Sequence, residues 1–120
     1  MAYDIKERSF KFAVKTAKFI EKLPKRQTTF EYGRQLIRSS GSVGANLEEA
    51  DGALSKKDFV NKIGIARKEV KESKYWLQLI KEVGSFNGKD MSAELECLIG
   101  ESDELRLIFS SIINKARANV

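Results

Sequence analysis

The amino-acid sequence predicts an all-α protein, an up-down-up-down antiparallel four-helix bundle. Apolar residues recur at steps of three and four through most of the chain, which is the spacing of one helix face. No segment alternates between apolar and polar residues for long enough to indicate a β-strand. The segments between the helical patterns are short, and short connections make neighbouring helices antiparallel. A length of 120 residues fits a single domain that spans 1–120.

A first helix is expected at about residues 4–23. Phe12, Phe19 and Leu23 lie on one apolar line. A second, adjoining line consists of Phe10, Ala13, Val14, Ala17 and Ile20. An apolar surface this wide suits a helix that contacts two neighbours, as in a bundle or an oligomer. Pro24 ends the helix because a proline cannot continue it.

The next two helices are predicted to form a helical hairpin, at about 28–52 and 56–83. Thr28 is expected to cap the first with its hydroxyl, and Gly52 to end it. Ser55 is expected to cap the second. Their predicted buried lines are Leu36, Ser40, Val43, Leu47, Ala50 and Leu54 in the first, and Phe59, Ile63, Ala66, Val70, Ser73, Leu77 and Ile80 in the second.

A glycine-containing loop at 84–89 precedes the last helix, which is expected at about 90–118. The predicted buried line of this helix is Leu95, Leu98, Ser102, Leu105, Phe109, Ile112 and Ala116. The four helices together supply enough apolar residues for a core, since 42% of the chain is hydrophobic.

The second predicted helix contains a segment of small residues at 39–45. A glycine inside a helix costs roughly 1 kcal/mol relative to alanine, so something must offset that cost. One interpretation is that a neighbouring helix or subunit packs closely on Gly41, Gly44 and Ala45. The other is that a ligand lies against the bare backbone. We favour close packing.

Polar side chains on the same helix share one face. They are Arg38, Ser42, Asn46 and Glu49 and are called the polar strip below. Such a strip is either solvated or part of a hydrogen-bonded network with other helices or subunits. Arg38 and Asn46 are too far apart along one helix to contact each other directly, so a closed network would need partners on other helices.

Positive charge is concentrated in the first helix, and the formal net charge of the chain is +5. Four lysines step by four, three and four and form what is called the basic stripe below: Lys11, Lys15, Lys18 and Lys22. This stripe is either an ordinary solvated lysine face or a surface that binds polyanions such as RNA or DNA.

The sequence contains no recognisable catalytic or metal-binding constellation. Histidine, the commonest general base and zinc ligand, is absent, and Cys97 therefore has no histidine to activate it. The residues at 41–44 lack the lysine and the spacing of a phosphate-binding P-loop. No apolar run approaches the roughly 20 residues that span a bilayer. We expect a cytoplasmic protein with no enzyme activity, cofactor, metal or membrane association.

Several stretches match a known pattern: RSFKFA at 8–13, QLIRSSGSVGANLEEA at 35–50, SKKDF at 55–59 and IARKE at 65–69. These stretches resemble the small bacterial four-helix bundle proteins known as 23S rRNA intervening-sequence proteins. The resemblance implies assembly into a ring, with pentamers the best-known form. It also implies a relationship to the accessory variability proteins of diversity-generating retroelements, which are basic pentamers that bind a reverse transcriptase and nucleic acid.

Two functions are therefore expected. The first is a nucleic-acid or ribonucleoprotein accessory module that binds polyanions through its basic surface. Its partners would be its own copies in a homopentamer, RNA or DNA, or a nucleic-acid enzyme such as a reverse transcriptase. The second is a homo-oligomeric protein-interaction scaffold with no nucleic-acid role. The basic stripe slightly favours the first.

Overall fold

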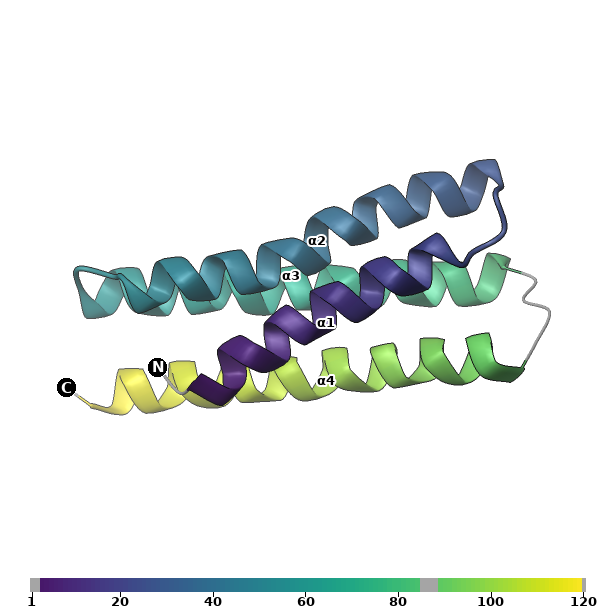
Figure 1. The fold of residues 1–120 in the computed structure, drawn as a ribbon. Helices are drawn as coiled ribbons and strands as arrows, with labels where there is room; N and C mark the ends of the chain where they lie inside the picture. Colours follow the sequence, from purple (N-terminus) through teal and green to yellow (C-terminus); the bar gives the residue numbers. More distant parts are fainter. Residues whose placement is uncertain (1–2, 85–88, 120) are drawn as a thin grey trace.

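The structure is a computed structural model that describes residues 3–84 and 89–119. Four helices follow one another along the chain: α1 (Tyr3–Glu21), α2 (Gln27–Asp51), α3 (Lys56–Val83) and α4 (Lys89–Ala118). They run alternately up and down in a rod with extents of 52 × 21 × 20 Å (Figure 1). No strand occurs among the described residues. The predicted all-α four-helix bundle is confirmed.

Each helix packs against two neighbours. α2 contacts α1 and α3, and α4 contacts α3 and α1, whereas the diagonal pairs make no close contact within the described ranges. α1 is the shortest helix and crosses the bundle obliquely, from the side of α4 to the side of α2 (Figure 1). Residues 85–88 of the predicted loop lie outside the described residues.

The beginning of α2 differs from the prediction, because Thr28 does not cap the helix. The helix begins at Gln27, directly after Arg26. The hydroxyl of Thr29 accepts a hydrogen bond from the backbone N–H of Arg26 at 3.1 Å and donates one to the carbonyl of Pro24 at 2.6 Å. The helix starts early enough after Pro24 that the buried Thr29, and not the exposed Thr28, reaches back to the preceding chain.

The connection between α2 and α3 agrees with the prediction in its caps. α2 ends at Asp51 with Gly52 as its C-cap residue, and the hydroxyl of Ser55 accepts a hydrogen bond from the backbone N–H of Asp58 at 3.0 Å. Leu54 was expected on the buried line of α2 but is 99% exposed. Because α2 ends before it, Leu54 no longer follows the helical spacing that would turn it inward.

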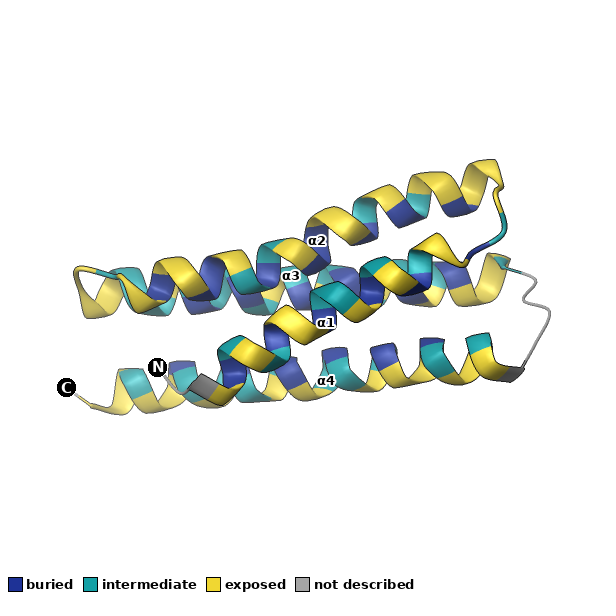
Figure 2. Ribbon diagram, viewed as in Figure 1, coloured by how far each residue is buried: buried dark blue, intermediate teal, exposed yellow. Residues whose placement is uncertain are grey.

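The buried residues of all four helices face the interior, and the exposed residues lie on the outer sides (Figure 2). The buried line of α1 contains two polar residues that the apolar pattern does not include, Ser9 and Thr16. Neither hydroxyl oxygen has a hydrogen-bond partner among the described residues. The second apolar line of α1 is only partly covered, and Phe10 on it is 69% exposed.

The buried line of α4 departs from the prediction near its end. It passes from Phe109 to Ile113, whereas Ile112 and Ala116 are only half-buried. An α-helix has 3.6 residues per turn, so a line of strict seven-residue repeats drifts around the helix. Two consecutive steps of four, from Leu105 to Phe109 and from Phe109 to Ile113, correct this drift and keep the buried line facing the other helices.

Candidate functional site

The basic stripe lies on an exposed side of α1, but two of its four lysines are paired. The ammonium of Lys11 lies 3.0 Å from the carboxylate of Glu7, and that of Lys22 lies 2.6 Å from the carboxylate of Glu94 on α4. Lys15 and Lys18 are exposed and have no ion-pair partner among the described residues. About half of the positive charge of the stripe is thus balanced within the chain.

The acidic first part of α4 pairs further with α1. The guanidinium of Arg8 lies 2.6 Å from the carboxylate of Glu101 and 2.9 Å from that of Glu104. The hydrogen bonds to Glu101 raise the pKa of Arg8 above its ordinary value, since they favour the charged form. The carboxylates of α4 therefore draw the cations of α1 into contacts between helices.

Arg38, the first residue of the polar strip, reaches α3. Its guanidinium lies 3.3 Å from the carboxylate of Glu69 and also pairs with Glu72. Glu72 in turn accepts a hydrogen bond from the indole N–H of Trp76 at 3.0 Å. The Arg38 side chain is half-exposed, so this group of side chains lies at the edge of the α2–α3 contact.

The other residues of the polar strip have different partners. The side-chain amide of Asn46 donates to the backbone carbonyl of Ser42 at 2.8 Å and to its hydroxyl at 3.3 Å, both within α2. Glu49 pairs with Lys62 of α3 at 3.1 Å. The two charged ends of the strip thus contact α3, while its middle bonds to α2 itself.

Of the small residues for which close packing was predicted, Gly41 and Ala45 are exposed and Gly44 is half-buried. An added Cβ at Gly41 would meet no atom within 4 Å, and one at Gly44 would only reach the Cβ of Ser9 at 4.0 Å. The tight contact between α1 and α2 lies instead at Gly33, where an added Cβ would sit 3.0 Å from Cγ2 of Ile20. Gly33 was not singled out from the sequence, although it lies seven residues before the buried Ser40.

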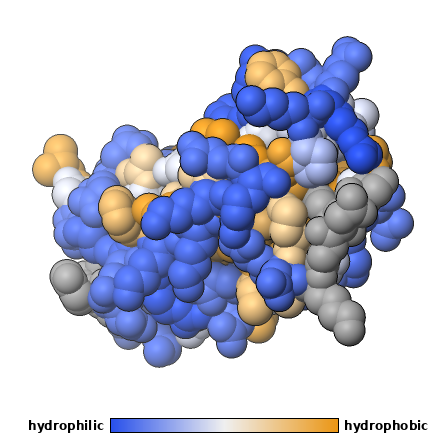
Figure 3. Space-filling model, turned by 45° about the vertical axis from the view of Figure 1, so that its right-hand side comes forward, coloured by the Kyte–Doolittle hydropathy of each residue, from blue (hydrophilic) through white to orange (hydrophobic). Residues whose placement is uncertain are grey.

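An apolar hollow of about 770 Å³ lies where α1 ends and α2 begins. Its apolar lining includes Ile20, Leu23, Phe30 and Ile37. Phe30 is 68% exposed and Ile37 is 50% exposed. Apolar side chains appear between hydrophilic ones in the space-filling view of the molecule (Figure 3). Phe30 and Ile37 are therefore apolar side chains that packing within the chain leaves exposed to solvent.

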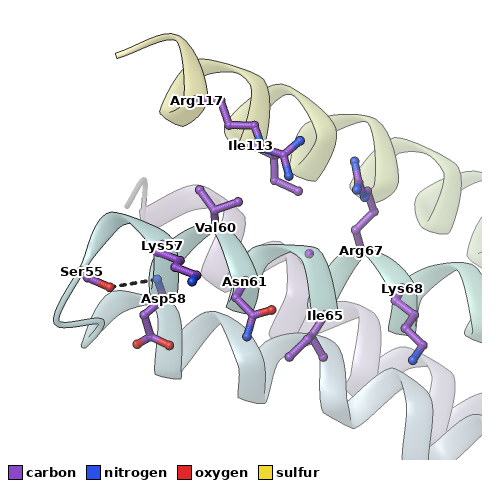
Figure 4. Close-up of a pocket in the computed structure, with 11 residues that line it drawn as sticks. Ser55, Lys57, Asp58, Val60, Asn61, Ile65, Arg67, Lys68, Ile113 and Arg117 are labelled. Atoms are coloured by element: carbon purple, nitrogen blue, oxygen red, sulfur yellow. Dashed lines mark hydrogen bonds between the residues drawn. The ribbon is translucent and has the colours of Figure 1, made fainter. Parts of the chain in front are cut away.

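A second hollow, of about 650 Å³, lies between the beginning of α3 and the end of α4 (Figure 4). We call it the cationic pocket. Its charged and amide lining residues are Lys57, Asp58, Asn61, Arg67, Lys68 and Arg117. Arg67 donates to the hydroxyl of Ser110 at 3.2 Å, whereas Lys57, Lys68 and Arg117 have no ion-pair partner within the described ranges. The sequence pattern did not indicate this pocket, because its lining combines the beginning of α3 with Ile113 and Arg117 near the end of α4.

The described residues contain no group of three or more Cys, Asp or Glu side chains placed to hold a metal ion. Cys97 is exposed. Within the same residues, every helix is too short or too polar to cross a bilayer.

The fold and these surfaces define an antiparallel four-helix bundle with an unevenly paired charged surface. The model of the 23S rRNA-intervening sequence protein family matches residues 1–108, and the chain belongs to this family. A crystal structure of a protein of unknown function from the S23 ribosomal protein family of Bacteroides thetaiotaomicron is similar, with 34% sequence identity and a TM-score of 0.80. The similarity covers 92% of this chain and 95% of that one. No curated protein matches the chain.

Proposed function

We propose that this protein is a non-enzymatic, self-assembling four-helix bundle that binds RNA or DNA through its basic surface. The observation that carries the proposal is the unequal pairing of charges. Most carboxylates of the described residues lie in ion pairs, as in the contacts of α4 with α1 and of α2 with α3. Many lysines and arginines have no such partner, so the charge left for a ligand is positive.

Unpaired lysines favour contacts with phosphates, and phosphate contacts carry little sequence information. Lys15 and Lys18 of the basic stripe have exposed ammonium groups available for such contacts. One chain offers only a few of them, so a monomer would bind weakly. Several copies joined in an assembly would multiply the contacts and raise their effective concentration.

Self-assembly is proposed from the surface formed by α1 and α2. Phe10, Phe30 and Ile37 are exposed there, and Gly41 leaves α2 uncovered. A second copy of this chain would bury the apolar side chains and would offset the cost of the glycine by close packing. The assembly proposed is the pentamer that the family resemblance implies.

The test measures the fluorescence anisotropy of labelled RNA and DNA across a salt series, with light scattering to give the assembled mass. We expect a mass near five chains. Binding should weaken as salt rises, with a slope of about −0.7 per contact on single strands and −0.9 on duplex DNA. The variant in which all four lysines of the basic stripe become glutamate should bind more weakly. Absence of binding by the wild-type protein at about 50 mM salt would contradict the proposal.

The second candidate function is a scaffold that binds protein and not nucleic acid. The exposed Phe10, Phe30 and Ile37 favour it, because apolar side chains of this size mark protein interfaces. The two functions differ in the anisotropy experiment. An assembled protein that binds neither RNA nor DNA would favour the scaffold.

A further inference from the structure

The cationic pocket and the hollow between α1 and α4 differ in their balance of charge. The hollow between α1 and α4 is lined by Arg8, Lys11 and Lys15, but also by the carboxylates of Glu94 and Glu101, and Arg8 is paired with Glu101. The cationic pocket has four cationic side chains and a single carboxylate, that of Asp58. In Figure 4 its two arginines lie on the side of α4, while Asn61 and Lys68 lie on the other side of the α3 backbone. A polyanion would therefore meet a larger excess of positive charge in the cationic pocket than in the hollow between α1 and α4.

Gly64 forms part of the wall of the cationic pocket. An added Cβ at this position would meet no atom within 4 Å, so packing inside the chain does not require a glycine here. Glycine also weakens the interior of a helix relative to alanine. The missing side chain leaves the wall of the pocket open to a group from outside the chain.

The line of residues that borders the pocket continues along α3. Lys57, Asn61, Gly64 and Lys68 are followed at the same spacing by Lys71 and Tyr75, both of which are exposed. With a rise of 1.5 Å per residue, the line from Lys57 to Tyr75 extends for about 27 Å, which is more than a single small anion would cover. Tyr75 is 54% exposed, and its ring meets the ring of Trp76 edge-on, with the two ring centroids 5.3 Å apart. The Tyr75 ring is therefore supported from one side and accessible from another.

We propose that the cationic pocket and the line from Lys68 to Tyr75 bind the backbone of a single-stranded nucleic acid. Its phosphates contact the lysines and arginines, and one base stacks on Tyr75. A single strand is inferred because an aromatic side chain can stack only on a base that is not enclosed in a duplex. This inference rests on the proposed function and deepens it, since it places the main contact on α3 and α4.

The first test compares two double variants with equal changes of charge. One replaces pocket residues, Lys57→Glu with Arg117→Glu, and the other replaces stripe residues, Lys15→Glu with Lys18→Glu. The probe is a fluorescein-labelled single-stranded RNA read by anisotropy, with circular dichroism to check the fold. We expect the affinity of the pocket variant for RNA to be lower by roughly tenfold or more. The plot of its log affinity against log salt concentration should be less steep by about 1.4, the value for two lost phosphate contacts on a single strand. The stripe variant should lose less.

Two results separate failure of the inference from failure of the proposed function. If the pocket variant binds as tightly as the wild type, or if the stripe variant loses as much affinity, the cationic pocket is not the main site and the inference is wrong. If the wild-type protein does not bind RNA at all, both the proposed function and this inference are wrong. Tighter binding of an acidic peptide than of RNA at the same salt concentration would also overturn the inference.

The second test leaves the charge unchanged. Gly64→Leu would obstruct the wall of the pocket and should weaken RNA binding, whereas Gly100→Leu, at another open glycine on α4, should leave binding unchanged. Tyr75→Ala should weaken binding to single strands by roughly tenfold or more, and Tyr75→Phe should restore most of it because the ring remains. Equal losses on a duplex and on a single strand would contradict the stacking contact.

Discussion

The contact between α1 and α2 is built differently at its two ends. At one end the helices approach so closely that a Cβ added to Gly33 would lie 3.0 Å from Cγ2 of Ile20. At the other end the ammonium of Lys6 lies 3.0 Å from the carboxylate of Asp51 and 3.3 Å from that of Glu48. The first contact depends on shape and the second on charge. α1 is therefore attached to α2 by two kinds of interaction that respond to different changes.

The physical consequences of the two contacts differ. A close contact between helices is sensitive to added volume, because the interior of a protein is packed as densely as an organic crystal. An ion pair near solvent is screened by water and salt and contributes little to stability. We therefore expect substitutions at the packed end to have larger effects than substitutions at the ionic end, and only the ionic end to respond to pH.

The largest effect is expected for Gly33→Leu at the packed end. The new side chain would overlap Ile20, and overpacking of this kind typically costs about 1–3 kcal/mol. Urea denaturation followed by circular dichroism would measure the loss in the free energy of unfolding. Gly100→Leu is the matched control, because an added Cβ at Gly100 meets nothing within 4 Å and the variant should be at least as stable as the wild type. If both variants lose the same stability, the packed contact does not set the cost.

A smaller effect of opposite sign is expected for Thr16→Val in the middle of α1. Thr16 is fully buried and its hydroxyl has no hydrogen-bond partner among the described residues. A buried hydroxyl without a partner is costly, so replacing it by a methyl group should raise the free energy of unfolding by about 1 kcal/mol. Thr28→Val at an exposed position provides the control, and both are measured by thermal and urea unfolding. A clear loss of stability in Thr16→Val would mean that the hydroxyl has a partner after all.

These buried hydroxyls also show how far the sequence predicts the fold. The apolar spacing gave the number and order of the helices, and local rules gave the bounds of α3, including its Ser55 cap. The predicted buried line of α1 was incomplete, because Ser9 and Thr16 have polar side chains. They are buried because they share a helix face with Phe12 and the other apolar residues of this line. Thr28 and Leu54 were misplaced because each lies within two residues of a helix end, where one residue changes the direction of a side chain.

The candidate sites were harder to predict for a different reason. The basic stripe is a local pattern, so its four lysines could be found along one helix. Whether a lysine is available to a ligand depends on carboxylates from another helix, as with Lys22 and Glu94. The cationic pocket depends on α3 and α4 together, and no local spacing connects Lys57 with Arg117. Sequence patterns therefore located the charges but not their pairing.

The smallest effect is expected at the ionic end of the α1–α2 contact. The hydrogen bond from Lys6 lowers the pKa of Asp51 below its ordinary value of 3.8, because it favours the charged carboxylate. A carboxyl group with a lowered pKa adds stability above its unfolded-state pKa, and that contribution is lost as the pH falls through the lower, folded-state value. The same pairing raises the pKa of Lys6 above 10.5, so its contribution is present below that pH and is lost as the pH rises through the raised value.

Asp51→Asn should therefore lower the free energy of unfolding slightly at neutral pH. It should also remove part of the decrease in that free energy that the wild-type protein shows in acid. Urea midpoints of the wild type and the variant, measured from neutral pH down to about pH 3, should converge as the carboxylate becomes protonated. Glu82→Gln, at an exposed glutamate of α3, serves as a control for the loss of one carboxylate and should change the pH dependence less. A constant difference between wild type and Asp51→Asn at every pH would show that the ion pair is not its cause. The effect of Gly33→Leu should stay the same across this range, because no titrating group takes part in the packed contact.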